Sequence, residues 1–97
     1  MKVRILTEAL FDLEQGHLFY ESQDAGLGGY FLDSLFSDID SLALYAGVHP
    51  KIHSYHRQLS KRFPYAIYYA LRDEVVEVWR VLDCRQDPSQ IKKRLTQ

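Results

Sequence analysis

The sequence is poor in cysteine and contains no long hydrophobic segment. Its single cysteine, Cys84, cannot form an internal disulfide, so we expect the reducing environment of the cytoplasm. Its apolar runs are short, whereas a helix that crosses a bilayer needs roughly 20 apolar residues. This excludes a membrane-spanning segment. Because residues 1–4 lead directly into an expected strand, we also expect no signal sequence.

An excess of charge of either sign is also absent. The 97 residues include 12 Lys and Arg against 13 Asp and Glu, which gives a formal net charge of -1. Broad, non-specific binding to nucleic acid requires cations that neutralise phosphates. The balance therefore argues against direct DNA binding by the chain alone, although it is compatible with a local basic patch.

Residues that could bind a metal ion or act as nucleophiles are few and poorly placed. His49, His53 and His56 span a loop that contains Pro50 and then enter an expected strand. They therefore lack the common face that two histidines share on one helix turn. Cys84 has no partner cysteine and no adjacent histidine, so we expect it to be inert. The sequence predicts no metal site and no cofactor.

The sequence does have enough apolar residues for one core. With 97 residues, of which 46% are hydrophobic, the chain can form one domain with a modest core. No internal repeat or low-complexity tract interrupts it. We therefore expect residues 1–97 to form a single domain.

The first half of the chain predicts a strand and two helices. Residues 2–6 alternate polar and apolar, as in a strand, and Thr7 is placed as the N-cap of an amphipathic helix over residues 8–22. Residues 24–29 predict a tight turn, and a second helix follows over residues 28–46. The two helices should pair as an antiparallel hairpin.

In the second half of the chain, after a loop that begins at Gly47, the period of the apolar residues changes from about 3.6 to 2. This change predicts an antiparallel three-stranded meander followed by a short helix. The expected strands are residues 54–61, 65–72 and 75–82, with a hairpin turn at Asp73 and Glu74 and a final helix capped by Asp87. The order β-α-α-β-β-β-α predicts an α+β fold with a helical hairpin on a largely antiparallel sheet.

The two faces of the expected middle strand differ in bulk. One face is continuously bulky and should pack under the helices; it carries Tyr65, Ile67, Tyr69 and Leu71. The other face carries Ala66, Tyr68 and Ala70, and we expect a shallow docking groove there, beside Arg57 and Arg85. The last strand is apolar on both faces, which is typical of a central strand. Strict alternation places Val76, Val78 and Leu82 on one of its faces and Val75, Trp79 and Val81 on the other.

The text "FPYAIYYALRDEVVEVWRVLDCRQDP" at residues 63–88, followed by a short basic helix ending "IKKRL", resembles the RelE/ParE superfamily of bacterial type II toxins. The segments "EALFDLEQGHLFYESQ" and "GGYFLDSLFSDIDSL" are similar to the two helices that precede the sheet in that family. The resemblance implies a small cytoplasmic toxin of the plasmid-stabilisation type. It also implies a cognate antitoxin that wraps a segment across the toxin's helices and sheet.

The RelE branch cuts mRNA in the ribosomal A site, which requires cations that converge on one patch of the sheet. Arg57 and Arg85 match positions of that branch. In contrast, Ala66 stands where the branch has its key arginine, Ile91 where a tyrosine is frequent, and Asp83 where many relatives have histidine. We therefore interpret the chain as not a nuclease, without catalytic residues of its own. If it were a ribosome-dependent mRNA endoribonuclease, its catalytic residues would be Arg57, Arg62, Tyr68 and Arg85.

The ParE branch resembles this chain more closely, in the Arg-Phe-Pro-Tyr entry at residues 62–65 and in the Arg80-Val81-Leu82 run. In that branch the toxin poisons DNA gyrase by protein contact. The resemblance implies a surface that contacts the target or the antitoxin and consists of Arg57, Lys61, Arg62, Tyr68, Arg80, Arg85, Lys92, Lys93 and Arg94. A degenerate, non-toxic family member is the remaining alternative.

Overall fold

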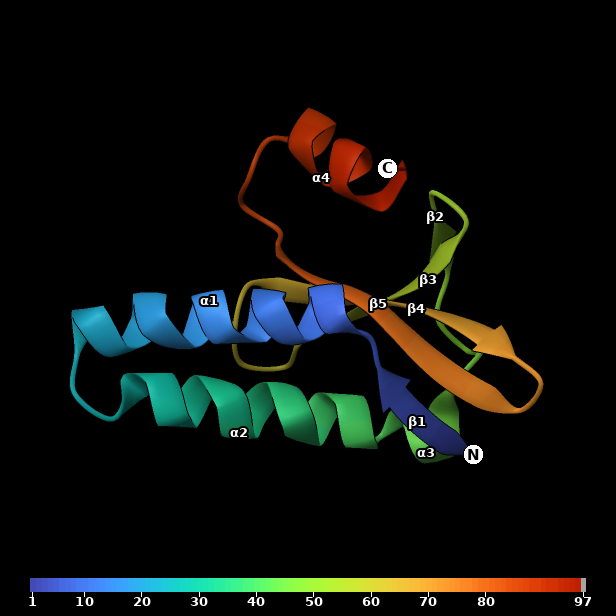
Figure 1. Ribbon diagram of the computed structural model, residues 1–97, viewed down its shortest axis with the longest axis horizontal. Helices are drawn as coiled ribbons and strands as arrows, with labels where there is room; N and C mark the ends of the chain where they lie inside the picture. Colours follow the sequence, from blue (N-terminus) through green and yellow to red (C-terminus); the bar gives the residue numbers. More distant parts are fainter. Residues whose placement is uncertain (97) are drawn as a thin grey trace.

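A five-stranded sheet separates two layers of helices in this protein, whose computed structural model describes residues 1–96 (Figure 1). The long helices α1 and α2 form an antiparallel hairpin on one side, and α4 lies on the other side. The elements are β1 (Lys2–Ile5), α1 (Thr7–Gln23), α2 (Leu27–Asp40), α3 (Leu42–Tyr45), β2 (Lys51–Ile52), β3 (Tyr55–Leu59), β4 (Tyr65–Arg72), β5 (Val75–Asp83) and α4 (Pro88–Thr96). The α+β prediction is confirmed.

The strands lie in the order β1-β5-β4-β3-β2. The chain from β2 to β5 pairs antiparallel at each step, which confirms the predicted meander, whereas β1 pairs parallel with β5. As its two apolar faces predict, β5 has a neighbouring strand on each side. Its partner β1 ends early, however, because the last residue of β1 in register, Ile5, lies opposite Val78. Among residues 1–96, no strand pairs with the rest of β5 on that side.

The helices differ from the prediction in two places. First, α1 begins at Thr7 with Leu6 as its N-cap, and no side chain caps it. The Leu6 N–H still bonds to the Val78 carbonyl as an extension of β1, so the chain turns one residue earlier than expected. Second, the expected helix over residues 28–46 is interrupted at Ser41. The Asp38 carbonyl accepts bonds from the Ser41 hydroxyl and the Gln58 amide, and these side chains compete with the helical backbone bond.

The predicted turn between the long helices is confirmed, and it is fastened by a side chain. Gly26 has a φ of 89°, a left-handed conformation that suits glycine. The carboxylate of Glu21, at the end of α1, accepts the N–H groups of Gly26 at 3.0 Å and Gly28 at 2.9 Å. These backbone bonds lower the pKa of Glu21. A residue of the first helix therefore caps the second.

Two tight hairpin turns have both central residues at positive φ, as in type I′ turns. Asp73 and Glu74, at 51° and 62°, form the turn that the sequence predicts between β4 and β5. His53 and Ser54, at 54° and 74°, form a second such turn between β2 and β3. The expected loop after Gly47 thus contains the short strand β2, whose two residues are too few to show a period.

The main core lies between the sheet and the helix pair α1–α2. It includes Phe31 at 0%, Tyr65 at 8%, Ile67 at 0% and Tyr69 at 0% exposure, which confirms that the bulky face of β4 packs under the helices. Leu71, predicted on the same face, is 41% exposed. It sits at the end of β4, close to the hairpin turn.

A β-bulge at Trp79 overturns the predicted alternation along β5. Tyr68 lies opposite Arg80 and Tyr69 lies opposite Val78, so Trp79 is an extra residue. Beyond the bulge the two faces exchange. Val81 therefore joins Val78 in the core under the helices, and Leu82 turns toward α4. Tertiary pairing, rather than the local pattern, places the bulge.

Candidate functional site

The face of the sheet that points away from α1 and α2 is covered by α4. Ala66 at 0%, Tyr68 at 1%, Leu82 at 4% and Leu95 at 6% exposure form a second, smaller core there. The expectation of an open, shallow docking groove on this face is therefore wrong. From α4, Leu95 joins this core and packs with Ala66 and Leu82 of the strands. Tyr68 is not available at the surface.

Arg57, on β3, is held against Tyr68 and Cys84. Its Nε donates to the Tyr68 hydroxyl at 3.3 Å, and its Nη2 donates to the Cys84 sulfur at 3.6 Å. Burial acts to lower the pKa of Arg57, but the bonds to Tyr68 and Cys84 outweigh it, so the pKa is raised. This guanidinium supports the small core beneath α4 and is partly buried.

Two other candidate cations are paired within the chain. Arg80 forms a two-point ion pair with Asp12 of α1, with both N–O distances 2.8 Å. Arg85 forms one with Asp83, at 3.0 and 2.8 Å, and also donates to the Tyr20 hydroxyl at 3.3 Å. The bond from Arg85 is the largest cause of the lowered pKa of Asp83.

The nuclease alternative requires Arg57, Arg62, Tyr68 and Arg85 to converge, and the structure brings together two of them. Arg57 contacts Tyr68 on the α4 side, whereas Arg85 contacts Tyr20 of α1 on the opposite side. Arg62 is exposed in the loop before β4. These four side chains therefore do not line one common pocket.

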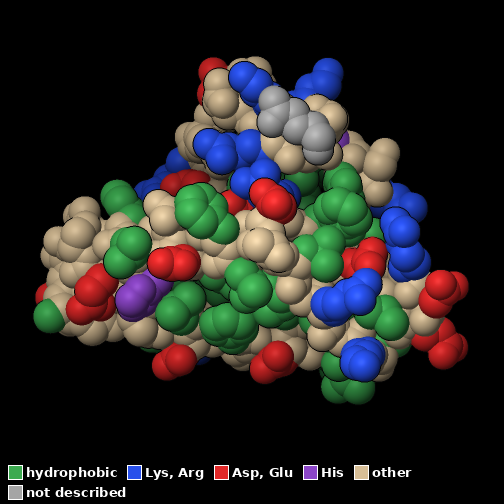
Figure 2. Space-filling view, in the orientation of Figure 1, with side chains coloured by type: hydrophobic (Ala, Val, Ile, Leu, Met, Phe, Trp, Pro, Cys, Tyr) green, Lys and Arg blue, Asp and Glu red, His purple; other side chains and the backbone are tan. Residues whose placement is uncertain are grey.

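The remaining candidate cations are exposed. Lys61 and Arg62 lie in the β3–β4 loop, and Lys92, Lys93 and Arg94 lie on α4. Figure 2 shows Lys and Arg side chains gathered over α4, with hydrophobic and acidic side chains interspersed over the long helices below. The basic C-terminal helix that the sequence predicts thus presents a positively charged surface, next to the more apolar surface of the long helices.

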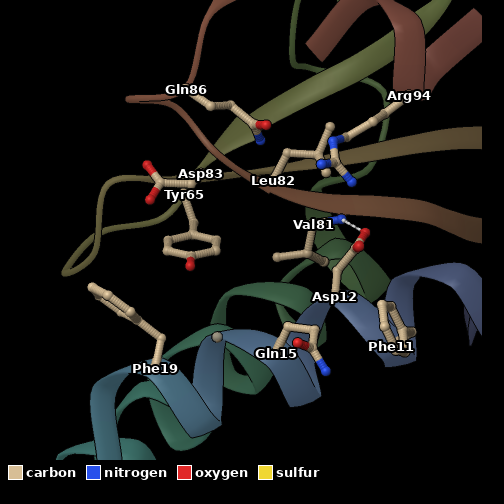
Figure 3. A pocket seen from close by; sticks show the side chains of 11 residues that line it. Phe11, Asp12, Gln15, Phe19, Tyr65, Val81, Leu82, Asp83, Gln86 and Arg94 are labelled. Atoms are coloured by element: carbon tan, nitrogen blue, oxygen red, sulfur yellow. Dashed lines mark hydrogen bonds between the residues drawn. The ribbon is translucent and has the colours of Figure 1, made fainter. Parts of the chain in front are cut away.

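A groove of about 430 Å³ runs between α1, the end of β5 and α4. We call it the α1 groove. Phe11, Gln15 and Phe19 project from α1 on one side, and Leu82 and Arg94 lie on the other (Figure 3). The remaining lining residues are Asp12, Gly16, Tyr65, Val81, Asp83 and Gln86.

The electrostatics of the α1 groove favour an apolar occupant with a negative charge. Both carboxylates in its lining, Asp12 and Asp83, are neutralised by arginines. Arg94 forms no ion pair with any side chain within residues 1–96. Burial, together with the nearby Asp83 charge, raises the pKa of Tyr65 to about 12, so this lining phenol is neutral at physiological pH.

The sequence pattern does not predict this groove, because an amphipathic α1 would present a polar outer side. The buried side of α1 consists of Ala9, Asp12, Leu13, Gly16 and Tyr20. Leu10 is 48% exposed. Phe11, Leu18 and Phe19 are 60%, 54% and 48% exposed and give the helix a second apolar side. Phe11 and Phe19, which lie outside the core stripe and line the groove, are the signal that could have revealed it.

The described residues offer neither a metal-binding cluster nor a membrane-spanning helix. Within residues 1–96, no group of three or more His, Cys, Asp or Glu side chains is arranged to hold a metal ion. His53, one of the three clustered histidines, is an exposed turn residue. Over the same residues, none of the helices combines the length and the apolar character that crossing a bilayer requires.

Comparisons with known proteins identify the fold. No protein-family model matches the sequence, and no curated protein matches it. Among solved structures, the chain is similar to one from the "Chromosomal ParDE TA system from P. aeruginosa", with a TM-score of 0.74 and 14% identity. The match covers 84% of this chain and 92% of that chain. The predicted RelE/ParE-like fold is thereby confirmed.

Proposed function

We propose that this protein is the toxin of a type II toxin–antitoxin system of the plasmid-stabilisation type, and that it acts in the cytoplasm by protein contact. The observation that carries the proposal is the α1 groove, an exposed apolar surface with aromatic walls on a ParE-like fold. A groove with exposed aromatic walls and a few polar groups is typical of a protein-binding site. A cognate antitoxin is the partner that we assign to it.

The exposed cations support an encounter with acidic partners. Lys61 and Arg62 on one loop and Lys92, Lys93 and Arg94 on α4 are free to interact with a partner's carboxylates. Charges at the rim of an interface mainly accelerate association and select partners. DNA gyrase is the target that we propose to test first, following the ParE branch.

The ribonuclease alternative finds less support. Where that branch needs a phosphate-handling arginine, this chain has Ala66, buried beneath Leu82 and Leu95. Asp83 forms an ion pair with Arg85, the expected cation. This pair neutralises the positive charge that would otherwise stabilise a phosphate. A substrate phosphate would meet apolar atoms and paired charges, which do not stabilise a pentavalent transition state.

Inducible expression separates the toxin from a degenerate family member. We expect growth to stop when the chain is expressed alone and to resume when the small reading frame beside its gene is co-expressed. Normal growth on expression of a folded, full-length chain would refute toxicity.

A supercoiling assay with purified DNA gyrase tests the mechanism. We expect loss of supercoiling with the intact chain, and no A-site cleavage of mRNA in translating extracts. Unchanged supercoiling at high excess would refute the gyrase target. A-site cleavage that disappears in Arg57→Ala, but persists in the exposed control Lys92→Ala, would establish the nuclease alternative instead.

A further inference from the structure

The α1 groove contains an open edge of the sheet. Strand β1 pairs with β5 as far as Val78, and the chain then leaves into α1. Within the part of the chain that the structure describes, the following part of β5 pairs only with β4, as far as Asp83 opposite Tyr65. Val81, Leu82 and Asp83 are all residues of the groove lining. An unpaired strand edge is a template for a further strand.

Hydrogen-bond directions show which backbone groups face the groove. The Val81 N–H donates to the Asp12 carboxylate at 3.0 Å, so it points away from β4. Because N–H and C=O directions alternate along a strand, the backbone groups of Asp83 also point toward this edge, whereas those of Leu82 point toward β4. The Cys84 N–H bonds to the carbonyl of Pro64, the residue just before β4, so it points toward β4 as the alternation requires.

Two of the four edge groups are occupied. Asp12 takes the Val81 N–H, and the Asp83 carbonyl accepts the Gln86 N–H at 3.4 Å. The Val81 carbonyl and the Asp83 N–H have no partner among the turn, loop and side-chain hydrogen bonds of residues 1–96. A carbonyl and an N–H two residues apart on one strand are the pair that a single residue of a parallel neighbour satisfies.

We propose that the α1 groove binds an extended segment of a protein partner, which adds to the sheet as a strand parallel to β5. One residue of the segment donates its N–H to the Val81 carbonyl and accepts the Asp83 N–H. An antiparallel strand would need the Val81 N–H or the Asp83 carbonyl, which are already bonded. The proposal rests on the proposed function only in taking the occupant to belong to a protein partner.

The walls of the groove define the side chains of the segment. Successive side chains of a strand point to opposite faces. Those that face the helix pair meet Phe19 and Tyr65, and those that face α4 meet Leu82 and Arg94 (Figure 3). The expected occupant therefore has apolar residues at alternate positions and an acidic residue at an intervening position, where its carboxylate reaches Arg94.

Selection from a library of random short peptides, displayed on phage against the full chain, tests this recognition. We expect selected peptides to alternate apolar residues and to carry an Asp or Glu between them. On binding a synthetic copy, the Asp83 amide should become protected from hydrogen exchange. N-methylation of the peptide residue that bonds to the Val81 carbonyl should weaken binding about tenfold or more, whereas N-methylation of the next residue should not.

Matched variants locate the site. Phe19→Ala should weaken peptide binding by about tenfold, while Leu18→Ala, equally exposed but outside the groove, should change it less than about twofold. Arg94→Gln should abolish the preference for an acidic residue, and Lys92→Gln should preserve it. Circular dichroism confirms that each variant is folded.

Several outcomes would overturn the proposal. These are selection of no peptide, selection of peptides with helical spacing, binding that leaves Asp83 exchange unchanged, and equal effects of Phe19→Ala and Leu18→Ala. Self-association of the chain through the groove would also overturn it, because the occupant would then be a second copy. The growth assay reports separately on toxicity, so failure of the peptide site and failure of the proposed function are distinguishable.

Discussion

Asp12 of α1 and Arg80 of β5, distant in the sequence, form a two-point ion pair with both N–O distances 2.8 Å. The same carboxylate accepts the Val81 N–H at 3.0 Å. Asp12 thus supplies the acceptor that a neighbouring strand would supply where β1 has ended, and the bond from Asp12 is the largest cause of the raised pKa of Arg80. One side chain fastens the first helix to the open part of the sheet.

Replacing Asp12 should destabilise the protein more than most substitutions. The side chains of Asp12 and Arg80 are 9% and 16% exposed, so Asp12→Ala leaves a largely buried guanidinium without its counter-charge and the Val81 N–H without its acceptor. We expect the free energy of unfolding, measured by urea denaturation, to fall by about 3 kcal/mol. Glu14→Ala, on the exposed side of the same helix, should change it by less than about 0.5 kcal/mol.

Asp12→Asn separates the two roles of the carboxylate. The amide oxygen of Asn still accepts the Val81 N–H, but it lacks the charge that pairs with Arg80. Its unfolding free energy should therefore lie between those of the parent and Asp12→Ala. An Asn variant as unstable as the Ala variant would show that the bond to the strand edge contributes nothing measurable.

Two adjacent glycines at the start of α2 should respond in opposite ways to alanine. A Cβ at Gly28 would lie 2.6 Å from the His17 ring and 2.7 Å from the His17 backbone oxygen, where little can move. Gly28→Ala should cost about 1–3 kcal/mol. A Cβ at Gly29 meets nothing within 4 Å, so Gly29→Ala should stabilise the helix by about 0.5–1 kcal/mol. Thermal unfolding of both variants measures these changes in stability. A stabilised Gly28→Ala variant would contradict the close approach of the two helices.

Restoring the arginine of the RelE branch should unfold the chain rather than create a nuclease. Ala66 is fully buried beneath Leu82 and Leu95, so Ala66→Arg introduces a bulky, unpaired cation into an apolar site. We expect a loss of more than about 3 kcal/mol in urea denaturation. Ala70→Arg, on the same face of β4 but partly exposed, should cost less than about 1 kcal/mol. A stable Ala66→Arg protein would mean that α4 can move away from the sheet at little cost in free energy.

Stability should fall in mildly acidic solution because of His49. The Tyr69 hydroxyl accepts the Gly47 N–H at 2.9 Å and shares a hydrogen bond with His49 Nδ1, 2.6 Å away. Burial and the neighbouring His56 lower the pKa of His49 from its ordinary 6.5. A lowered pKa means that the unfolded chain binds more protons, so stability is complete above 6.5 and decreases as the pH falls below it.

Urea denaturation at about pH 8 and about pH 5 measures this effect. His49→Gln should reduce the difference in unfolding free energy between the two conditions. His53→Asn, an exposed turn position where Asn tolerates the positive φ, should leave the difference unchanged. An unaltered pH dependence in His49→Gln would contradict the role of this histidine.

Much of the fold could be predicted because its signals are local. Tyr65, Ile67 and Tyr69 repeat at period 2 and lie on one buried face. Asp73 and Glu74 form the two-residue turn that joins the last strands. Asp87 caps α4, since its carboxylate accepts the Ser89 N–H at 2.8 Å. Each of these features depends on side chains within a few residues of one another, so the sequence alone contains the information.

The candidate site depends on contacts that no local pattern encodes. The bulge at Trp79 exchanges the faces of Val81 and Leu82, and it arises where β5 passes from pairing with two strands to pairing with one. Helix α4 packs over Ala66, and Asp12 bonds to the edge of β5. Both contacts join residues that are far apart in the chain. The sequence by itself determined the two long helices, the longer strands, the final helix and their order, but not β2 or the break between α2 and α3. Tertiary packing decided which face is covered and which edge stays open, because burial and strand pairing are properties of the assembled chain.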